Sequence, residues 1–296
     1  MSNALHTETK EVPLGTGPPT REELRVYYTP RFTWTQLRLF INFGDLGLLK
    51  RDKALHRRYC KWGDGIKAEY GSMVDYLLNH RLQWGNPDRL SLLPSEIDDS
   101  VFPYTSQLQE RELSMQHSES RNYFTYDTPP ELISIIQNDW PYSVPLEIEH
   151  SLVWTKLPIL PAPSLIIPCI AATLSPELQE KVSARLAQDG LWGFTGSIDP
   201  PPSPTLLPQA MGRLSDWGIT LETLVITPKG TEEEERAIQL SGVEVQKFVM
   251  KRWIEREWET CWFVNPPRLQ SVKDLAHIHV FARKKSPDEM ARWDAA

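Results

Sequence analysis

Two histidines near the end of the chain stand two residues apart, in the segment AHIHVFAR. His277 and His279 alternate there with Ile278 and Val280, and alternate residues of a β-strand point to the same side of a sheet. Both imidazoles are therefore expected on one face of a strand, where a neutral imidazole can accept a proton during a reaction. The chain has only 7 histidines, so this pair is the first candidate for a functional site.

Polar side chains precede this strand in a proline-containing turn. Asn265 and Gln270 carry amides that can stabilise the oxyanion of a tetrahedral intermediate. Ser271 could carry an acyl group if a neighbouring histidine activated its hydroxyl. The alternative is that the histidines are core residues bound to backbone carbonyls. A metal site completed by His150 is a weaker alternative, because the spacing fixes no fourth ligand.

A second group of chemically active residues is the segment EIEH. Glu147 and Glu149 are expected on one face of a strand, and His150 on the other. Asp139 lies shortly before them in the turn NDWPY. Carboxylates bind a guanidinium through paired hydrogen bonds, and a buried one can act as a general base. The alternative is a solvated strand edge.

A third group is basic, in the segment KRDKALHRRYCKW. Phosphates of a nucleic acid would bind such a cluster, although the net charge of the whole chain is −7. The alternative is a solvated helix face. The candidate residues for RNA binding are Lys50, Arg51, Arg57, Arg58 and Lys61.

The elements that must position these residues follow from hydrophobic periodicity and capping signals. Helices are expected over 33–43, 52–62, 68–84, 129–140, 175–190 and 231–257. Strands are expected over 146–159, 223–228, 259–265 and 276–283. The pattern predicts an α+β fold, in which a helical N-terminal part is followed by a mainly antiparallel sheet.

The domain organisation follows from composition. Residues 1–25 are expected to be a disordered tail, and residues 26–296 a single α+β domain with a long Pro-rich insertion near 157–208. No apolar run reaches the length of a membrane span, and the N-terminus lacks the apolar core of a signal peptide. We therefore expect a soluble cytoplasmic protein without membrane association. Three widely spaced cysteines argue against disulfides and zinc, and no glycine-rich phosphate loop is present, so we expect no metal and no cofactor.

The spacing of the C-terminal block, N-x4-Q-S followed by H-x-H, resembles the signature of histidine-triad nucleotide-binding proteins. That resemblance implies a histidine-triad-like sheet and a nucleotide hydrolase or transferase. The chain departs from the signature at the third histidine position, where Phe281 stands. It could therefore share the scaffold without the nucleotidyl chemistry.

Three blocks together resemble a fungal family described as a domain of unknown function, which includes the N-acetylglucosamine-induced proteins. They are YGSMVDYLLNHRLQW (70–84), IIQNDWPYSVPLEIEHSLVWTKLPI (135–159) and CWFVNPPRLQSVKDLAHIHVFAR (261–283). One branch resembles the arginine-containing cyclodipeptide synthases of fungal secondary metabolism. That resemblance implies an acyltransferase-type enzyme that takes arginyl-tRNA and a second aminoacyl-tRNA as partners and joins the two amino acids as a diketopiperazine.

The residues offer what this chemistry requires. His277, His279, His150 and Ser271 are the catalytic candidates. The candidates for substrate binding are Glu147, Glu149, Asp139, Asn265 and Gln270. Two alternatives remain: the histidine-triad-like nucleotide hydrolase or transferase, and a non-catalytic protein of sugar-response signalling with structural histidines.

Overall fold

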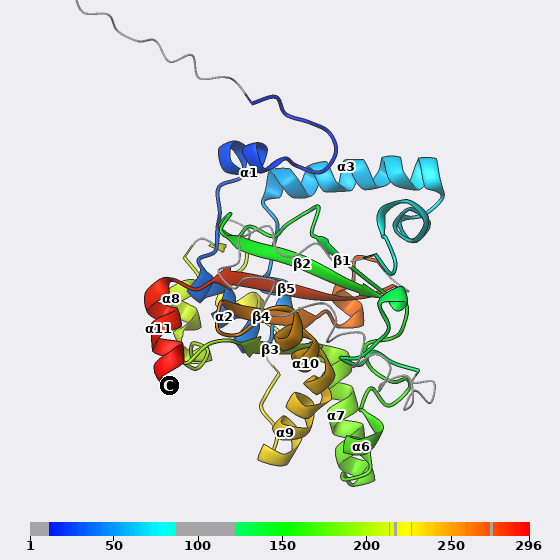
Figure 1. The fold of residues 1–296 in the computed structure, drawn as a ribbon, viewed down its shortest axis with the longest axis vertical. Helices are drawn as coiled ribbons and strands as arrows, with labels where there is room; N and C mark the ends of the chain where they lie inside the picture. Colours follow the sequence, from blue (N-terminus) through cyan, green and yellow to red (C-terminus); the bar gives the residue numbers. More distant parts are fainter. Residues whose placement is uncertain (1–11, 87–121, 213, 216–217, 226, 273–274) are drawn as a thin grey trace, which may run out of the picture.

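A five-stranded antiparallel sheet, in the order β1-β2-β5-β4-β3, forms the centre of the protein in a computed structural model (Figure 1). The structure describes residues 12–86, 122–212, 214–215, 218–225, 227–272 and 275–296. The strands are β1 (Ile133–Gln137), β2 (Ile148–Thr155), β3 (Leu191–Thr195), β4 (Trp258–Val264) and β5 (Ala276–Lys284). This sheet and the helices around it confirm the prediction of an α+β fold.

One face of the sheet is apolar and packs against three helices. Ile278 and Val280 of β5 point to this face and are fully buried. The covering helices contribute branched side chains such as Val182, Ile238 and Val249 to the same cluster. They are α7 (Pro176–Asp189), α9 (Glu232–Ser241) and α10 (Val243–Arg252). The alternation of β5 therefore sends its aliphatic residues to one side and leaves its histidines for the other.

The opposite face carries the histidines and is covered mainly by N-terminal helices. Phe40 and Phe281 belong to one buried cluster on this face, and Leu77 and Trp154 to a neighbouring one. Figure 1 shows α1 and α3 at one end of the molecule, across the sheet from α6 (Pro168–Ala171) and α9. The N-terminal helical elements are α1 (Arg21–Tyr27), α2 (Trp34–Phe43), η1 (Leu46–Leu48), α3 (Lys53–Tyr70), α4 (Met73–Tyr76) and η2 (Leu77–Arg81).

The remaining elements are short turns and one terminal helix. They are η4 (Pro130–Leu132), η5 (Pro204–Leu206), α8 (Leu207–Ala210), η7 (Leu221–Thr223), η8 (Pro267–Leu269) and α11 (Pro287–Ala295). None of the helices in the described part of the chain is both long and apolar enough to cross a membrane.

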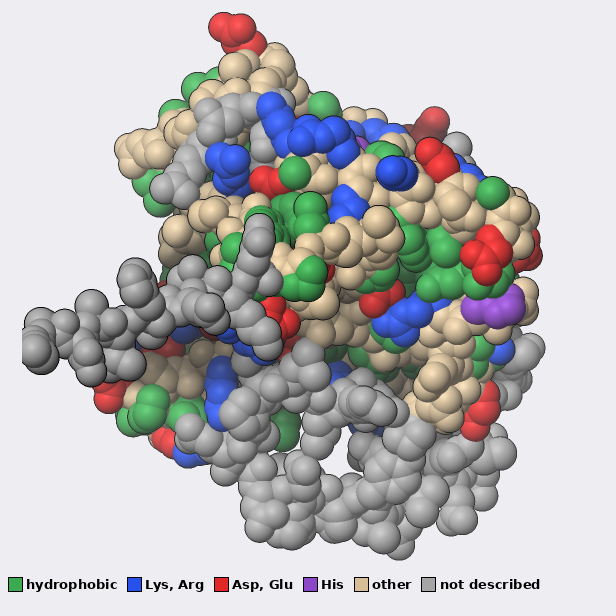
Figure 2. All heavy atoms as spheres, turned by 90° about the horizontal axis from the view of Figure 1, so that it is seen from above, with side chains coloured by type: hydrophobic (Ala, Val, Ile, Leu, Met, Phe, Trp, Pro, Cys, Tyr) green, Lys and Arg blue, Asp and Glu red, His purple; other side chains and the backbone are tan. Residues whose placement is uncertain are grey.

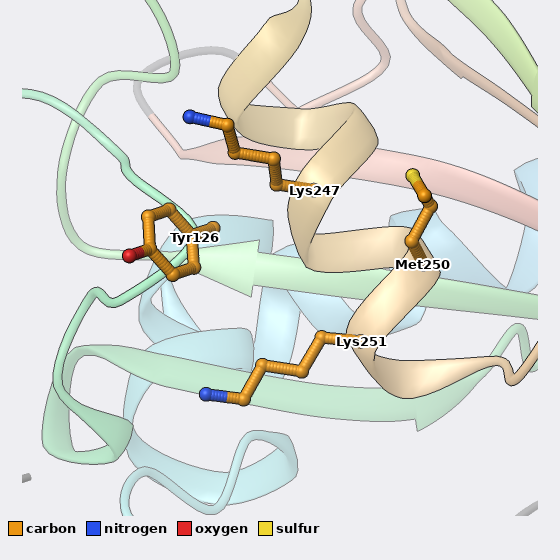
Figure 3. Close-up of a pocket in the computed structure, with 4 residues that line it drawn as sticks. All are labelled: Tyr126, Lys247, Met250 and Lys251. Atoms are coloured by element: carbon orange, nitrogen blue, oxygen red, sulfur yellow. The ribbon is translucent and has the colours of Figure 1, made fainter. Parts of the chain in front are cut away.

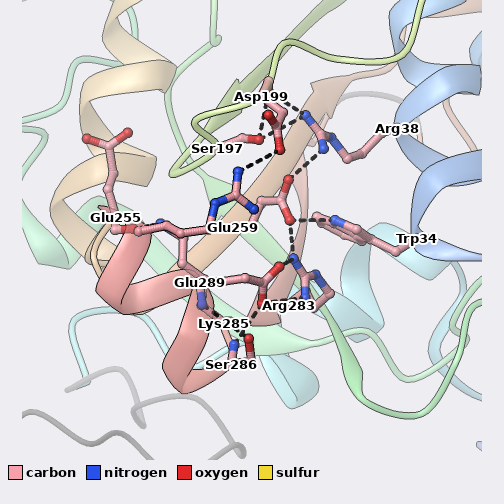
Figure 4. A network of polar contacts seen from close by, with 11 residues as sticks. Trp34, Arg38, Ser197, Asp199, Glu255, Glu259, Arg283, Lys285, Ser286 and Glu289 are labelled. Carbon is pink, nitrogen blue, oxygen red and sulfur yellow. Dashed lines mark hydrogen bonds and ion pairs between the residues drawn. The ribbon is translucent and has the colours of Figure 1, made fainter. Parts of the chain in front are cut away.

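A charged network fastens α2 and α11 to the end of the histidine face (Figure 4). Glu259 of β4 binds Arg38 at 2.7 Å and Arg283 at 2.5 Å, and it accepts a hydrogen bond from the indole of Trp34 at 2.7 Å. Arg283 also binds Glu289 of α11 at 2.7 Å. One buried carboxylate therefore joins two strands to two helices that lie far apart in the sequence.

Several sequence predictions are wrong in detail. Residues 129–140 form η4 and then β1, not a helix, because the two prolines open only a single turn before the apolar run pairs with β2. The described residues of 223–228 form no strand: Leu224 follows η7, and the Val225 N–H donates to Asp45 at 3.0 Å. The helix expected over 231–257 is two helices, α9 and α10, that meet at Gly242.

Two of the expected boundaries also differ. The predicted tail of residues 1–25 overlaps α1, which begins at Arg21 because Thr20 and Glu23 form a capping box there. The residues before Val12 lie outside the described part. The Pro-rich segment 157–208 is not an insertion outside the fold, since it contains α7 and the edge strand β3. The possible histidine-triad-like architecture stays a prediction.

Candidate functional site

Two histidines from neighbouring strands are hydrogen-bonded to each other inside the protein. His150 Nε2 lies 3.1 Å from His279 Nδ1, and His279 Nε2 lies 3.2 Å from the amide nitrogen of Asn265. Strand register explains the contact, because β2 pairs with β5 so that Leu152 lies opposite His279 and Phe281 opposite His150. The three side chains form a buried polar chain that runs from β2 across β5 to the end of β4.

The turn after β1 completes this chain from the other side. Asn138 lies with its amide nitrogen 3.3 Å from His150 Nε2 and 3.4 Å from Nδ1. The Asn138 side-chain oxygen accepts the N–H of Trp140 at 3.0 Å, which is the local hydrogen bond of an Asx turn. The backbone N–H of Tyr142 points at His150 Nδ1 at 3.4 Å. Sequence reasoning missed Asn138 and Tyr142, although the turn-forming residues of NDWPY were the available signal.

Aromatic rings hold the two imidazoles in place. The Tyr142 ring is nearly parallel to that of His279, with an interplanar angle of 11° and centroids 5.6 Å apart. Phe263, which pairs with His279 across β4 and β5, stacks on the His279 ring with centroids 4.5 Å apart, and Phe281 stacks on His150 at 4.0 Å. Phe281, at the position where a histidine triad has its third histidine, therefore supplies a packing surface and no proton-transferring group.

Burial keeps the imidazoles uncharged. Desolvation lowers the pKa of His150 well below its usual value, and the positive charge of nearby Arg51 lowers it further. Desolvation likewise lowers the pKa of His279 well below its usual value, with added effects of His277, His150 and Arg51. Each neutral ring then has one N–H and one lone pair. The pair can pass a proton from one ring to the other without either ring facing bulk water.

A cavity of about 310 Å³ adjoins His150. β1 ends at Gln137, which pairs with Ser151, so the first three residues of β2 pair with no residue of β1. The cavity lies beside these three residues and is bordered by the turn 138–147. Leu24 and Tyr28 line it from the α1 side, and Leu55 lines it from α3. The charged residues that line the cavity are Asp52, Asp139, Glu149, Arg21 and Arg81. Three carboxylates against two guanidiniums favour a cationic ligand over an anionic one.

The predicted carboxylates have different surroundings. Asp139 binds Arg81 as a two-pronged fork, with Nε at 2.7 Å and Nη2 at 2.8 Å from its two oxygens. Glu149 lines the cavity, but it lies on the strand face opposite His150, where it accepts a hydrogen bond from Ser151 at 2.8 Å. Glu147 is exposed in the turn before β2 and does not line the cavity. Asp139 is therefore the carboxylate that already binds a guanidinium at the cavity.

The other predicted catalytic residues do not reach the cavity. His277 is buried, donates from Nδ1 to the Leu275 carbonyl at 3.2 Å and packs on Trp154 at 4.3 Å. Ser271 is exposed, and the structure describes no hydrogen bond between it and a histidine. Gln270 donates to the backbone carbonyl of Asn265 at 3.1 Å and so supports that residue. His277 is therefore a core histidine bound to a backbone carbonyl, which was the alternative interpretation of the sequence.

The predicted basic cluster divides into an inner and an outer set. Arg51 donates to the Trp140 carbonyl at 2.8 Å and lies 4.5 Å from the Tyr59 ring, so it belongs to the wall of the site. Arg58 binds Glu23 of α1 at 2.9 Å in a buried ion pair. Lys50, Arg57 and Lys61 are exposed.

Within the described residues, no three or more histidine, cysteine, aspartate or glutamate side chains are grouped as ligands for a metal ion.

Comparisons with known proteins show the family to which the chain belongs. A family model described as "Protein of unknown function (DUF3605)" matches residues 33–188 and 225–283, which is more than half of the chain. The chain belongs to this family. The DUF3605 match includes β1, β2, β4 and β5, and therefore every member of the buried polar chain.

A curated relative of this DUF3605 chain is N-acetylglucosamine-induced protein 1 of Candida albicans. The two are 27% identical over 128 residues, which is 43% of this chain and 44% of the relative. The chain thus matches less than half the length of that relative. Among solved structures, "Crystal Structure of HTC1" covers 88% of this chain and 92% of its own, at 17% identity and a TM-score of 0.33.

Proposed function

We propose that this protein is a cyclodipeptide synthase that condenses arginine from arginyl-tRNA with a second aminoacyl group. One observation carries the proposal. A single cavity is lined by Asp139, which binds a guanidinium in a fork, and by His150, which begins a buried chain of proton-transferring groups. Recognition of a cationic side chain and acceptance of a proton are the two tasks that such a reaction requires of the protein.

The reaction needs no external energy source, since an aminoacyl ester is already activated. The α-amino group of one aminoacyl-tRNA attacks the ester carbonyl of the other, so that a peptide bond forms and a tRNA leaves through its ribose oxygen with the proton released by the amine. The second amine then closes the ring on the remaining ester and releases the second tRNA. Two aminoacyl-tRNAs yield one diketopiperazine and two deacylated tRNAs.

The residues have separate roles in this proposal. Neutral His150 accepts the proton from the attacking amine, and His279 with Asn265 holds the ring and shares the proton. Asn138, whose amide nitrogen lies beside His150, is a donor at the same end of the cavity. Asp139 binds the guanidinium. Arg81 uses one lone pair on each Asp139 oxygen and leaves another on each to accept a single N–H of the substrate guanidinium.

The sharpest test is mass spectrometry of products made by the purified protein from arginyl-tRNA and a mixture of other aminoacyl-tRNAs. An arginine-containing diketopiperazine is the expected product. Asp139→Asn keeps the size of the side chain and removes its charge, so arginine should lose its preference over neutral amino acids. Glu147→Gln is the matched control, because Glu147 is exposed and does not line the cavity.

A second candidate is a non-catalytic protein of the sugar response, which the name of the Candida relative suggests. Absence of any product from charged tRNAs, in a protein that is folded and binds RNA, would favour this candidate over the synthase. Hydrolysis of a nucleotide under the same conditions would instead favour the histidine-triad-like alternative.

A further inference from the structure

Helix α3 begins at the cavity and runs away from it. Its N-cap, Asp52, and Leu55 in its first turn both line the cavity. The helix is 18 residues long, or about 27 Å. Any long molecule with one end in the cavity can therefore follow the outer face of α3.

That outer face is basic along its first half. Arg57 and Lys61 are exposed and lie four residues apart, so their charges are separated by about 6 Å along one side of the helix. No acidic residue occurs between Lys53 and Gly63 in the sequence. We call Arg57 and Lys61 the α3 basic stripe. Figure 2 looks down on this end of the molecule, where lysine and arginine side chains gather among scattered acidic ones.

The stripe differs from the inner arginines of the same segment. Arg51 and Arg58 are held by Trp140 and Glu23, and they stabilise the site and α1. Replacement of either one would disturb the protein itself. The stripe residues instead point outward, so their charges are available to a ligand that approaches from solvent.

We propose that the acceptor end of a tRNA lies along the α3 basic stripe, with its esterified 3′ end in the cavity. This inference rests on the proposed function, which supplies the RNA. Charge distribution supports it: the chain has a net charge of −7, and the cavity lining itself has more carboxylates than guanidiniums. A polyanion is therefore repelled from most of the protein, and the two cations of the stripe, on the helix whose first turn lines the cavity, determine where the phosphates lie.

A second basic pair provides an internal comparison. Lys247 and Lys251 of α10 flank Tyr126 around an open hollow of about 330 Å³, and Met250 borders the same hollow (Figure 3). This pair has the same four-residue spacing, but α10 packs on the face of the sheet opposite the histidines. Lys247 is also paired with Glu244 at 3.1 Å.

The test is a salt titration of the binding of deacylated tRNA to the full-length protein. The variant with Arg57→Gln and Lys61→Gln should flatten the slope of log affinity against log salt by about two, because each lost phosphate contact lowers it by about one. The variant with Lys247→Gln and Lys251→Gln should keep the parental slope. All four side chains are on helix surfaces, so both variants should keep the parental thermal midpoint.

The outcomes separate this inference from the proposed function. An unchanged slope in the α3 variant, or an equal loss in the α10 variant, overturns the docking site even if diketopiperazine is formed. A flattened slope in the α3 variant alone supports the docking site even if no diketopiperazine is found, because binding of deacylated tRNA involves no chemistry.

Discussion

Two buried polar groups lie on the same face of the sheet and differ in charge: the His150–His279 chain and the network around Glu259. His279 lies opposite Phe263 on β4, whereas Arg283 lies opposite Glu259, so the groups are separated by four residues, or about 13 Å along the strand. The Glu259 network consists of ion pairs, with arginines on both sides of one carboxylate. The His150–His279 chain is neutral and lies next to a cavity.

The difference shows how burial can serve two purposes. A buried charge is tolerated when donors surround it, and the network around Glu259 meets that condition with two guanidiniums and an indole N–H. A buried neutral imidazole keeps a lone pair ready for a proton, and a cavity gives a substrate access to it. We therefore interpret the charged group as structural and the neutral group as functional.

The largest expected effect is on activity, from removal of the first member of the neutral group. His150→Gln should reduce the rate of product formation by about 10² to 10⁴, the usual contribution of a general base, while the protein stays folded. The measurement is single-turnover product formation together with urea unfolding. His277→Phe is the control, because His277 does not line the cavity. An equal loss of activity in both variants would remove the distinction between a catalytic and a structural histidine.

The next effect is on stability, from removal of the centre of the charged group. Glu259→Ala leaves Arg38 and Arg283 without their shared carboxylate and should lower the free energy of unfolding by about 3–5 kcal/mol. Asp294→Ala breaks a pair with Arg256 that is half exposed and screened by solvent, so it should cost far less stability. Urea unfolding measures both. If the two variants lose the same stability, the network around Glu259 is not the structural element that we describe.

The pH dependence of stability should separate the buried histidines from the charged network. Desolvation lowers the pKa of His277 from 6.5 to about 4, so between these values the unfolded chain binds a proton that the folded protein does not. His277 alone should therefore contribute a fall of about 3 kcal/mol in the free energy of unfolding as pH decreases through this window, and His277→Phe should remove that contribution and leave those of His150 and His279.

The charged network responds at lower pH. The hydrogen bond from Arg283 holds the pKa of Glu289 at about 2, against a usual value of 4.5. Its contribution is complete above the higher value and is lost as pH falls toward the lower one. Glu289→Gln should therefore flatten the stability profile between pH 4.5 and about 2, a range that overlaps the His277 window only at its acid end. A flattening above pH 4.5 would contradict this separation.

The smallest effect on stability and rate is expected for Gln270, which supports Asn265 at one end of the buried polar chain. Gln270 is half-buried and donates to the Asn265 carbonyl, so Gln270→Ala should cost about 1 kcal/mol of stability. Its effect on the rate should be much smaller than that of His150→Gln, because Gln270 touches neither histidine. Ser271→Ala, a change at an exposed neighbour, is the control. A loss of rate as large as that of His150→Gln would show that Gln270 contacts the substrate.

Much of the sheet could be predicted from local pattern. The alternation in AHIHVFAR fixed which residues of β5 share a face, and the capping residues Thr33 and Ser175 marked the starts of α2 and α7. β1 was mistaken for a helix because its first proline pair is a helix-opening signal, and only pairing with β2 determines the strand. Such pairing is a long-range interaction that a local window does not contain.

The site was predictable only as a set of candidates. Residue types indicated His150, His279, Asn265 and Asp139, and the structure brings the first three into contact. The roles of Asn138 and Tyr142 depend on how the turn after β1 folds back over β2. The inward orientation of Arg51 likewise depends on its contact with the Trp140 carbonyl. These are tertiary contacts that spacing along the chain does not encode.

The wall that α1 adds to the cavity lies outside the part of the chain that the family model matches. Pro18, Leu24 and Tyr28 line the cavity, yet all three precede residue 33, where the DUF3605 match begins. The buried pair of Glu23 and Arg58 ties this wall to a helix inside the match. Substitutions in the wall can therefore change the size of the group that the cavity admits while the histidine chain stays the same.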